Sequence, residues 1–353
     1  MTHNQIIEKL YLSEPNEIAA LYAEANAVKT STIGNKVYLR GLIEFSNICG
    51  KNCYYCGIRN ENKAVKRYEL SDDEVLAAVD FAWKNRYGSV VLQSGEQQSA
   101  RFTQRITHLL REIKAHTNNE VGITLSCGEQ TAETYRQWFN AGAHRYLLRI
   151  ETSNKELYYK LHPNDEKHSF DTRLNAIKQL RTEGYQVGTG VMIGLPFQTI
   201  EHLADDLLFF KSMNIDMVGM GPYLEHSQTP LYQHCSLFTR ENRLELSLKM
   251  VAVLRLLMPD INIAATTALQ VLHPEGREMA VLAGANIIMP NMTLPEFRSD
   301  YLIYEHKPGI KDDAALSKTK LEQNLQNAGI EISYGEWGDS QHYTCCAKQT
   351  NKV

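Results

Sequence analysis

The chain has 353 residues, of which 43% are hydrophobic and 22% charged, and its formal net charge is −4. This composition is typical of a globular protein that is large enough to bury its own core. Basic residues are scattered among acidic ones, which argues against a nucleic-acid-binding surface. There is no apolar run of the roughly 18 residues that a membrane span needs, and the N-terminus does not resemble a secretory signal. We therefore expect a cytoplasmic protein with neither a nucleic-acid nor a membrane partner.

Apolar segments that resemble strands alternate with amphipathic segments that resemble helices. After predicted helices in residues 1–36, the expected strands are 37–45, 89–94, 121–126, 145–151, 187–194, 216–221, 262–267 and 286–290. Ser71 and Glu74 predict a capping box at the start of the first intervening helix. Glycines stand where three later helices should end, at Gly142, Gly184 and Gly284.

Eight strands separated by helices predict an α/β fold, a single (β/α)8 TIM-type barrel over residues 37–309. We expect residues 1–36 to form an N-terminal helical cap over the bottom of this barrel. Residues 310–353 should form a short C-terminal extension, a helix followed by a polar tail. A doubly wound open sheet is the alternative, because eight strand–helix units also suit it.

Three of the seven cysteines, Cys49, Cys53 and Cys56, lie within eight residues of each other, directly after the first predicted strand. In a barrel this position is the first loop at the catalytic end. Three thiolates with C-x3-C-x2-C spacing can hold one compact metal centre, and a cubane iron–sulfur cluster with three Cys ligands keeps one iron open. A structural zinc site is the alternative, although no second ligand pair follows at zinc-finger spacing.

This spacing, with the aromatic Tyr55 before the last cysteine, resembles the defining motif of the radical SAM superfamily. The resemblance implies one [4Fe–4S] cluster whose open iron binds S-adenosyl-L-methionine (SAM). An electron from the cluster then splits SAM to give a 5′-deoxyadenosyl radical. Ser94-Gly95-Glu96, at the end of the second strand, resembles the family element that binds the SAM amino group.

Alternation along the fourth strand places Arg145, Leu147, Arg149 and Glu151 on one face. Charges that face a barrel interior are costly unless they are paired or used, so an anion-binding wall and an internal Arg–Glu salt bridge are both open. On the fifth strand, glycines share a face with Met192 at positions 188, 190 and 194. We expect the bare face to leave room for adenosine.

Segments from about residue 38 to residue 301 resemble, in order, the HydE family of [FeFe]-hydrogenase maturases, among them IEFSNICGKNCYYCGIRNENK, RYLLRIETSN and VMIGLPFQT. The resemblance implies action on a small organometallic substrate, a cysteine-bound organoiron complex, during assembly of the hydrogenase active-site cluster. Transient contacts with the maturases HydG and HydF are implied as well.

The resemblance also assigns site residues. The cofactor-binding positions are Tyr55, Ser94, Gly95, Glu96, Glu151, Arg173 and Met192, with Arg173 on the SAM carboxylate and Glu151 on the ribose. The substrate-binding positions are Arg40, Thr124, Arg145, Arg149, Thr266 and Thr267. Tyr301 corresponds to a pocket tyrosine with a catalytic role, and an aromatic residue at the barrel rim is the equally open alternative.

Some HydE proteins carry a second cysteine set near the C-terminus, but here only Cys345 and Cys346 remain, so we expect no stable second cluster. Cys127 and Cys235 should be small core or pocket residues. Methylornithine synthase and biotin synthase are the alternative enzymes. A non-catalytic metal-binding scaffold is the alternative from another class.

Overall fold

The computed structural model describes residues 1–234 and 236–350, the last five by their backbone only. Eight parallel strands close into a barrel, because β1 pairs with β10 through Tyr38–Ile287 and Leu39–Ile288. Around the barrel from β1 these strands are β1 (Lys36–Ser46), β2 (Ser89–Ser94), β3 (Gly122–Ser126), β4 (Arg145–Leu147), β5 (Gln186–Thr189), β7 (Met217–Val218), β9 (Asn262–Ala265) and β10 (Ile287–Ile288). The predicted TIM-type barrel is confirmed, and the open sheet is excluded.

Two of the expected strands are interrupted. The segment 187–194 divides into β5 and β6 (Met192–Ile193), and 216–221 divides into β7 and β8 (Gly221–Pro222). β6 and β8 pair with each other as a separate two-stranded sheet. At the break, a Cβ atom on Gly190 would lie 1.9 Å from the carbonyl oxygen of Gly219. Glycine is needed here because the two backbones touch.

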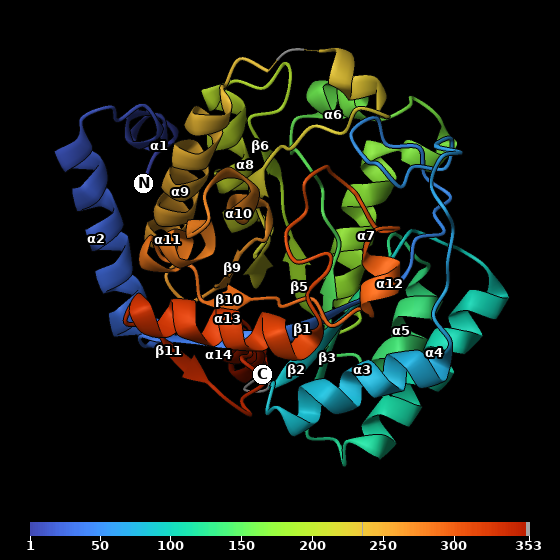
Figure 1. Cartoon of the computed structure of the whole chain (residues 1–353). Helices are drawn as coiled ribbons and strands as arrows, with labels where there is room; N and C mark the ends of the chain where they lie inside the picture. Colours follow the sequence, from blue (N-terminus) through green and yellow to red (C-terminus); the bar gives the residue numbers. More distant parts are fainter. Residues whose placement is uncertain (235, 351–353) are drawn as a thin grey trace.

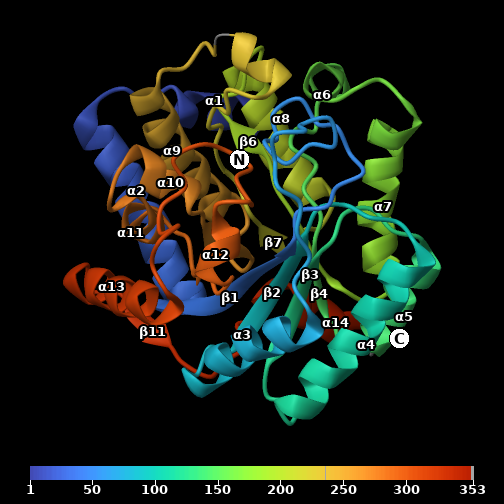
Figure 2. The same ribbon diagram turned by 45° about the vertical axis from the view of Figure 1, so that its right-hand side comes forward.

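Helices surround the barrel in both ribbon views (Figures 1 and 2). The predicted capping box is present where Ser71 precedes α3 (Asp72–Lys84), and the three glycines expected at helix ends have positive φ. The other helices after β2 are α4 (Ala100–His116), α5 (Ala132–Asn140), α6 (Lys155–Leu161), α7 (Phe170–Thr182), α8 (Ile200–Ser212), α9 (Arg240–Leu257), α10 (Ala268–Leu272), α11 (Gly276–Leu282) and α12 (Pro295–Arg298). None of the helices in the described ranges is both long and apolar enough to cross a membrane.

The N-terminal helices lie along the side of the barrel. α1 (His3–Leu10) packs on α8 and α9, and α2 (Pro15–Ile33) packs on α9 and α11. The expectation that they cover the bottom is therefore wrong. A different part of the chain closes that end and supplies the partners of two buried arginines there.

The C-terminal segment closes the bottom of the barrel. The predicted helix is α13 (Ala314–Asn327), but the expected polar tail contains β11 (Glu331–Ser333), which pairs with the start of β1, and α14 (Gln341–Thr350). Asp339 and Gly338 lie between β11 and α14. The fully buried Arg145 pairs with Asp339 at 2.5 Å, and Arg40 donates to the carbonyl oxygen of Gly338. We call residues 334–340 the basal plug. The domain boundaries at 36 and 309 stay predictions.

We expect Asp339→Asn to destabilise the protein by about 2–3 kcal/mol, because it leaves the buried Arg145 without its anion. Burial acts to raise the pKa of Asp339, but the hydrogen bond from His144 and the charge of Arg145 hold that pKa below its usual value. The carboxylate therefore stabilises the fold above its unfolded pKa near 4, and the stabilisation is lost as the pH falls through the lower folded value.

Urea denaturation at pH 7 and again below pH 4 measures the destabilisation and its dependence on pH. The difference in the free energy of unfolding between wild type and Asp339→Asn should be smaller at the lower pH. Glu133→Gln is the matched control, since it removes a carboxylate from an exposed pair with Arg136. Equal stability of wild type and Asp339→Asn at pH 7 would show that the plug does not depend on this ion pair.

Candidate active site

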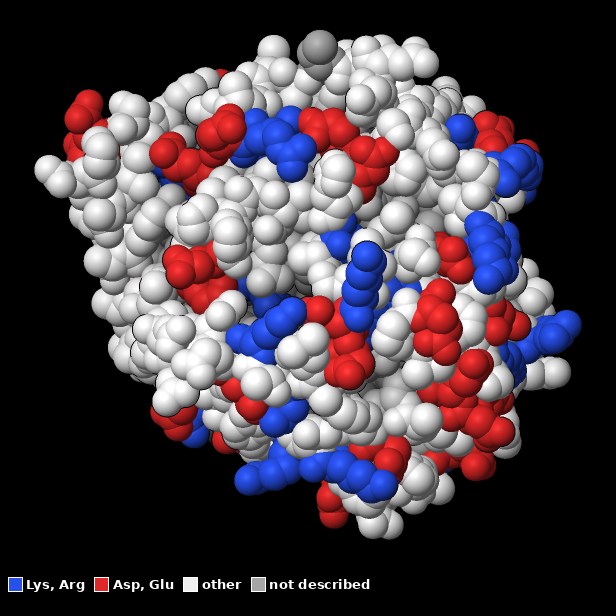
Figure 3. Space-filling view, viewed as in Figure 1, with Lys and Arg blue, Asp and Glu red and all other residues white. Residues whose placement is uncertain are grey.

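A cavity of about 350 Å³ opens at the carboxyl ends of the strands. Its wall includes side chains from the loop after β1, from the ends of β2, β4 and β9, from β6 and α7, and from the segment after α12. These side chains are Cys49, Cys53, Tyr55, Cys56, Ser94, Glu96, Arg149, Glu151, Arg173, Met192, Thr266, Thr267, Tyr301 and Lys307. The loop after β1 is tied to the segment after α12, because the amide of Gly57 donates to the carbonyl oxygen of Ile303 at 3.0 Å. In a TIM barrel this end is where chemistry takes place. Basic and acidic side chains are interspersed over the face that Figure 3 shows.

The three predicted cluster ligands lie together on this wall. Burial raises the pKa of Cys53 to about 12 and that of Cys56 well above its usual value. The charge of Cys49 raises both pKa values further, and the charge of Cys53 also raises the pKa of Cys56. The amide of Glu96 donates to the sulfur of Cys49 at 3.4 Å. Neighbouring buried thiols give up their protons only when a cation stabilises the thiolates. The donor set therefore fits a metal centre.

The spacing of these thiols favours a cluster over a single ion. In the described residues, no three side chains from His, Cys, Asp or Glu converge as one bound metal ion would require. A cubane has different geometry, because each cysteine binds a different iron and the sulfurs need not meet at one point. Three thiols on one cavity wall fit a [4Fe–4S] cluster, in which each of them would bind its own iron.

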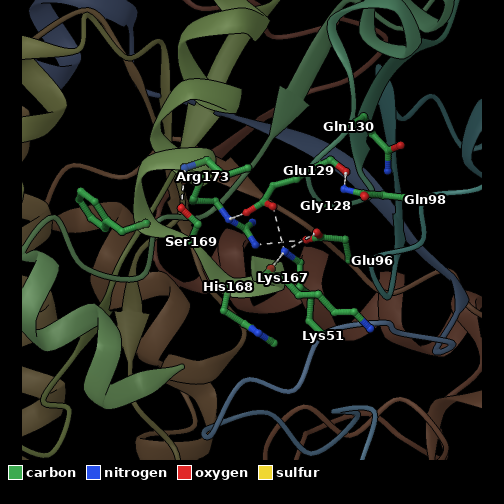
Figure 4. A network of polar contacts seen from close by, with 12 residues as sticks. Lys51, Glu96, Gln98, Gly128, Glu129, Gln130, Lys167, His168, Ser169 and Arg173 are labelled. Atoms are coloured by element: carbon green, nitrogen blue, oxygen red, sulfur yellow. Dashed lines mark hydrogen bonds and ion pairs between the residues drawn. The ribbon is translucent and has the colours of Figure 1, made fainter. Parts of the chain in front are cut away.

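Four charged side chains form a closed ring beside the thiols, with signs that alternate (Figure 4). Lys51 lies 3.0 Å from Glu96 and 2.9 Å from Glu129, and Arg173 lies 3.1 Å from Glu96 and 2.5 Å from Glu129. We call these four residues the charge ring. Each comes from a different βα unit: the loops after β1, β2 and β3, and α7, which follows β4.

The charge ring favours the charged forms of its two cations. Burial acts to lower the pKa of Lys51 and Arg173, but Glu96 and Glu129 raise both above their usual values. Burial raises the pKa of Glu96, whereas the two cations within 3.1 Å favour its ionised form. Two cations and two carboxylates sum to zero charge, which is the condition for burying four charges together.

Two glycines let the ring form. A Cβ atom on Gly128, whose φ is +74°, would lie 2.1 Å from Cγ of Glu96. On Gly95 it would lie 2.4 Å from the carbonyl oxygen of Ile48, next to Cys49. Glycine is therefore needed at position 95 because the end of β2 packs against the cysteine loop. Sequence reasoning missed Lys51 and Glu129, although Cys127-Gly128-Glu129 after β3 repeats the Ser94-Gly95-Glu96 pattern after β2.

Arg149 and Glu151 form the internal salt bridge that the sequence left open. The guanidinium donates from Nε and Nη2 to the two carboxylate oxygens, both at 2.8 Å. Its Nη1 donates to the carbonyl oxygen of Gly219, at the break between β7 and β8. Glu151 has a φ of +66°, rare for a residue with a side chain. Backbone strain of this kind is concentrated at functional sites.

The remaining predicted cofactor positions also line the cavity. The Tyr55 hydroxyl lies 3.2 Å from Nε2 of His162, whose pKa burial lowers to about 3. Ser94 donates to the carbonyl oxygen of Gly95 at 2.8 Å. Met192 faces the cavity from β6. The expectation that the glycines of the fifth strand leave room for adenosine is wrong. Cβ atoms at positions 188 and 190 would meet Met217 and Gly219 rather than open space.

Tyr301 is buried in the cavity wall, where its hydroxyl accepts a hydrogen bond from Gln93 at 3.3 Å. Its neighbour Lys307 forms a buried ion pair with Glu44 of β1, at 2.5 Å. Asn291 donates to the same carboxylate at 3.0 Å. The sequence did not indicate this pair, since Glu44 and Lys307 are 263 positions apart. It anchors the segment that carries Tyr301 to the barrel.

The structure does not bring the six expected substrate residues together. Arg149, Thr266 and Thr267 line the main cavity. Arg40 and Thr124 line a separate cavity of about 20 Å³ beneath it, and Arg145 donates to Thr124 at 3.0 Å while it pairs with the basal plug. A space of that size holds about one water molecule. Cys127 is buried, as expected, whereas Cys235 lies outside the described residues.

Comparison with known proteins agrees with this site. Residues 43–210 match the sequence profile of the radical SAM superfamily. The chain is 42% identical over 306 residues to the [FeFe] hydrogenase maturase subunit HydE of Thermotoga maritima, which covers 87% of this chain and 84% of that protein. It is 30% identical to a 3-methylornithine synthase of Methanosarcina acetivorans, over 79% and 76% of the two chains. A crystal structure of methylornithine synthase (PylB) superposes with a TM-score of 0.79 and 25% identity, covering 95% and 94%.

The chain belongs to the radical SAM superfamily. It is a radical SAM enzyme that uses SAM and one [4Fe–4S] cluster, held by Cys49, Cys53 and Cys56. Among the relatives named above, the hydrogenase maturase has the highest sequence identity to this chain, 42% against 30% and 25%.

We expect Gly128→Ala to weaken SAM binding at least about tenfold, because the new methyl group occupies the space of the Glu96 side chain. Gly335→Ala is the matched control. Gly335 has the same φ of +74°, and a Cβ atom there meets nothing within 4 Å. Equilibrium binding of SAM to the reconstituted proteins makes the comparison. If both variants lose affinity equally, backbone strain and not the collision with Glu96 is responsible.

Proposed function

We propose that this enzyme acts in [FeFe]-hydrogenase maturation, on a cysteine-bound organoiron complex. The observation that carries the proposal is the 42% identity to HydE, which extends over 84% of that maturase. The cavity supports it, because charged and hydroxyl side chains line its wall together with the three cysteines. Contacts with HydG and HydF, and a cytoplasmic location, stay predictions.

We assign the SAM site to the thiol side of the cavity. Glu96 accepts hydrogen bonds from the amino group of SAM, Arg173 binds its carboxylate, and Glu151 binds the ribose. The walls of this site are completed by four more residues that line the cavity: Tyr55 of the cysteine loop, Ser94 and Gly95 at the end of β2, and Met192 of β6. When bound, the cluster supplies the electron that cleaves SAM and yields the adenosyl radical.

The substrate occupies the remaining part of the cavity in this proposal. Arg149 lies against this part with Thr266 and Thr267, so an anionic complex would meet one guanidinium and two hydroxyl groups. Tyr301 is the proposed catalytic residue, because its buried hydroxyl is held in position by Gln93. Arg40, Thr124 and Arg145 belong to the base of the barrel, on β1, β3 and β4, and each of these strands continues to a residue of the cavity wall. In this proposal they act on the substrate only through these strands.

We expect anaerobically reconstituted protein to contain about four irons per chain. Cys53→Ser should lose the cluster and SAM cleavage together, while Cys345→Ser, which changes an exposed cysteine on α14, should retain both. Iron and sulfide analysis with detection of 5′-deoxyadenosine makes the measurement. About eight irons in wild type would contradict the prediction that Cys345 and Cys346 hold no second cluster. The side chain of Cys346 lies outside the described residues.

A second prediction tests the substrate. With SAM and dithionite, a synthetic iron carbonyl–cyanide–cysteine complex should accelerate the formation of 5′-deoxyadenosine at least about tenfold, because a correctly bound substrate turns unproductive cleavage into a directed reaction. The infrared bands of the carbonyl and cyanide ligands should change at the same time. Identical cleavage with and without the complex would contradict the maturase proposal.

Methylornithine synthase is the second candidate, favoured by the 30% sequence identity and by the TM-score of 0.79. Genome context separates the two functions. Neighbouring genes for HydF and HydG support the maturase, whereas pyrrolysine genes support the synthase. Production of 3-methylornithine by the purified enzyme would decide for the synthase.

A further inference from the structure

The charge ring contains two more charges than the proposed SAM site needs. Glu96 and Arg173 suffice for the amino and carboxylate groups of SAM, yet Lys51 and Glu129 already contact them at 3.0 and 2.5 Å. All four side chains are about nine-tenths buried. Each carboxylate touches both cations and each cation touches both carboxylates, so the ring has no free corner.

We propose that Lys51 and Glu129 are exchangeable counterions that occupy the binding positions of the amino-acid end of SAM until SAM arrives. This inference rests on the proposed roles of Glu96 and Arg173. Lys51 stands in for the SAM ammonium at Glu96, and Glu129 stands in for the SAM carboxylate at Arg173. No group or function assigned so far gives these two residues a role.

Charge balance supports the exchange. The amino-acid end of SAM is a zwitterion, so it adds one positive and one negative charge to a ring that is already neutral. When the ammonium takes Glu96 and the carboxylate takes Arg173, Lys51 and Glu129 are released together. These two already contact each other at 2.9 Å, so neither is left as an unpaired buried charge. No proton has to move and no charge has to leave the site.

The surroundings of the pair are suited to this role. Lys51 also donates to the carbonyl oxygen of Lys167, and Gln98 donates to the carbonyl oxygen of Glu129 at 2.8 Å. Both anchors lie outside the ring and are compatible with the exchange. Lys51 lies between Cys49 and Cys53, so its pairing also fixes the cysteine loop in the absence of SAM. The same lysine would thus connect occupancy of the SAM site with the loop that holds the cluster.

The exchange predicts an unusual pattern in a double-mutant cycle. In Lys51→Met, both carboxylates can still contact Arg173 before SAM binds, but Glu129 loses its partner afterwards. In Glu129→Gln, Lys51 loses its partner in the same way. Each single variant should therefore bind SAM at least about tenfold more weakly. In the double variant no charge is left unpaired, so its affinity should return to within about threefold of wild type.

Three probes sharpen the measurement on anaerobically reconstituted holoenzyme. S-adenosylhomocysteine has the same zwitterion without the sulfonium charge and should show the same cycle. SAM itself should be weakened more by Glu129→Gln, which leaves an excess positive charge, than by Lys51→Met. 5′-Deoxyadenosine lacks the amino-acid end, so its affinity should be the same in all four proteins. Iron content and the EPR signal of the reduced cluster are measured in parallel.

The matched control is Lys155→Met/Asp171→Asn, which neutralises an exposed pair between α6 and α7 and should leave every affinity unchanged. If wild type and this control do not bind SAM, or if Glu96→Gln binds it normally, the proposed SAM site is wrong. If they bind SAM and either single variant matches wild type, the exchange is wrong. The inference is also overturned if the double variant binds SAM as weakly as the single variants. The same holds if the single variants lose the cluster and the double variant does not recover it. Either result would mean that the charge ring only stabilises the structure.

Discussion

Closure of the barrel determines where every functional group lies. The closing contact is short, two residue pairs between β1 and β10, yet it makes all eight strands of the barrel parallel neighbours around one axis. The carboxyl ends of the strands then meet at one rim, and the loops that follow them face a common space. Residues as distant as Glu44 and Lys307 become direct partners for this reason, although 263 positions separate them. Without this pairing, β1 and β10 would lie far apart in the strand order, and the loop after β1 would be separated from the segment after α12.

A barrel interior that carries charges must supply their counterions, and β4 shows two solutions on one face. Arg145 points toward the bottom of the barrel and is neutralised by Asp339, which lies 194 positions further along the chain. Arg149 lies nearer the cavity and is neutralised by Glu151, two positions away, with further support from Gly219 at the break between β7 and β8. The first arrangement seals the base. The second keeps a cation at the cavity wall while the backbone around it departs from regular strand geometry.

Much of the architecture could be predicted from the sequence, because periodicity and helix-end signals are local. The eight strand positions, the capping box at Ser71 and the glycines at helix ends were all found in this way. The interrupted strands were missed, since the clash between Gly190 and Gly219 exists only after the strands are adjacent. The basal plug was missed for the same reason. Its residues are polar and lack a regular period, and their partners are buried arginines of distant strands.

The parts of the site that lie within one short segment could be predicted from the sequence, and the parts that come from distant segments could not. The three cysteines could be assigned from their spacing alone, whereas Lys51 and Glu129 gained meaning only when four βα units were placed side by side. Lys51 sits inside the motif and still gave no signal, because a single lysine in a polar loop usually faces solvent. Its burial here agrees with charge neutrality, because Lys51 supplies the positive charge that balances two carboxylates and one guanidinium beside the cysteine loop. In the proposed SAM site, the charge that holds the cysteine loop in place therefore balances the groups that would bind SAM.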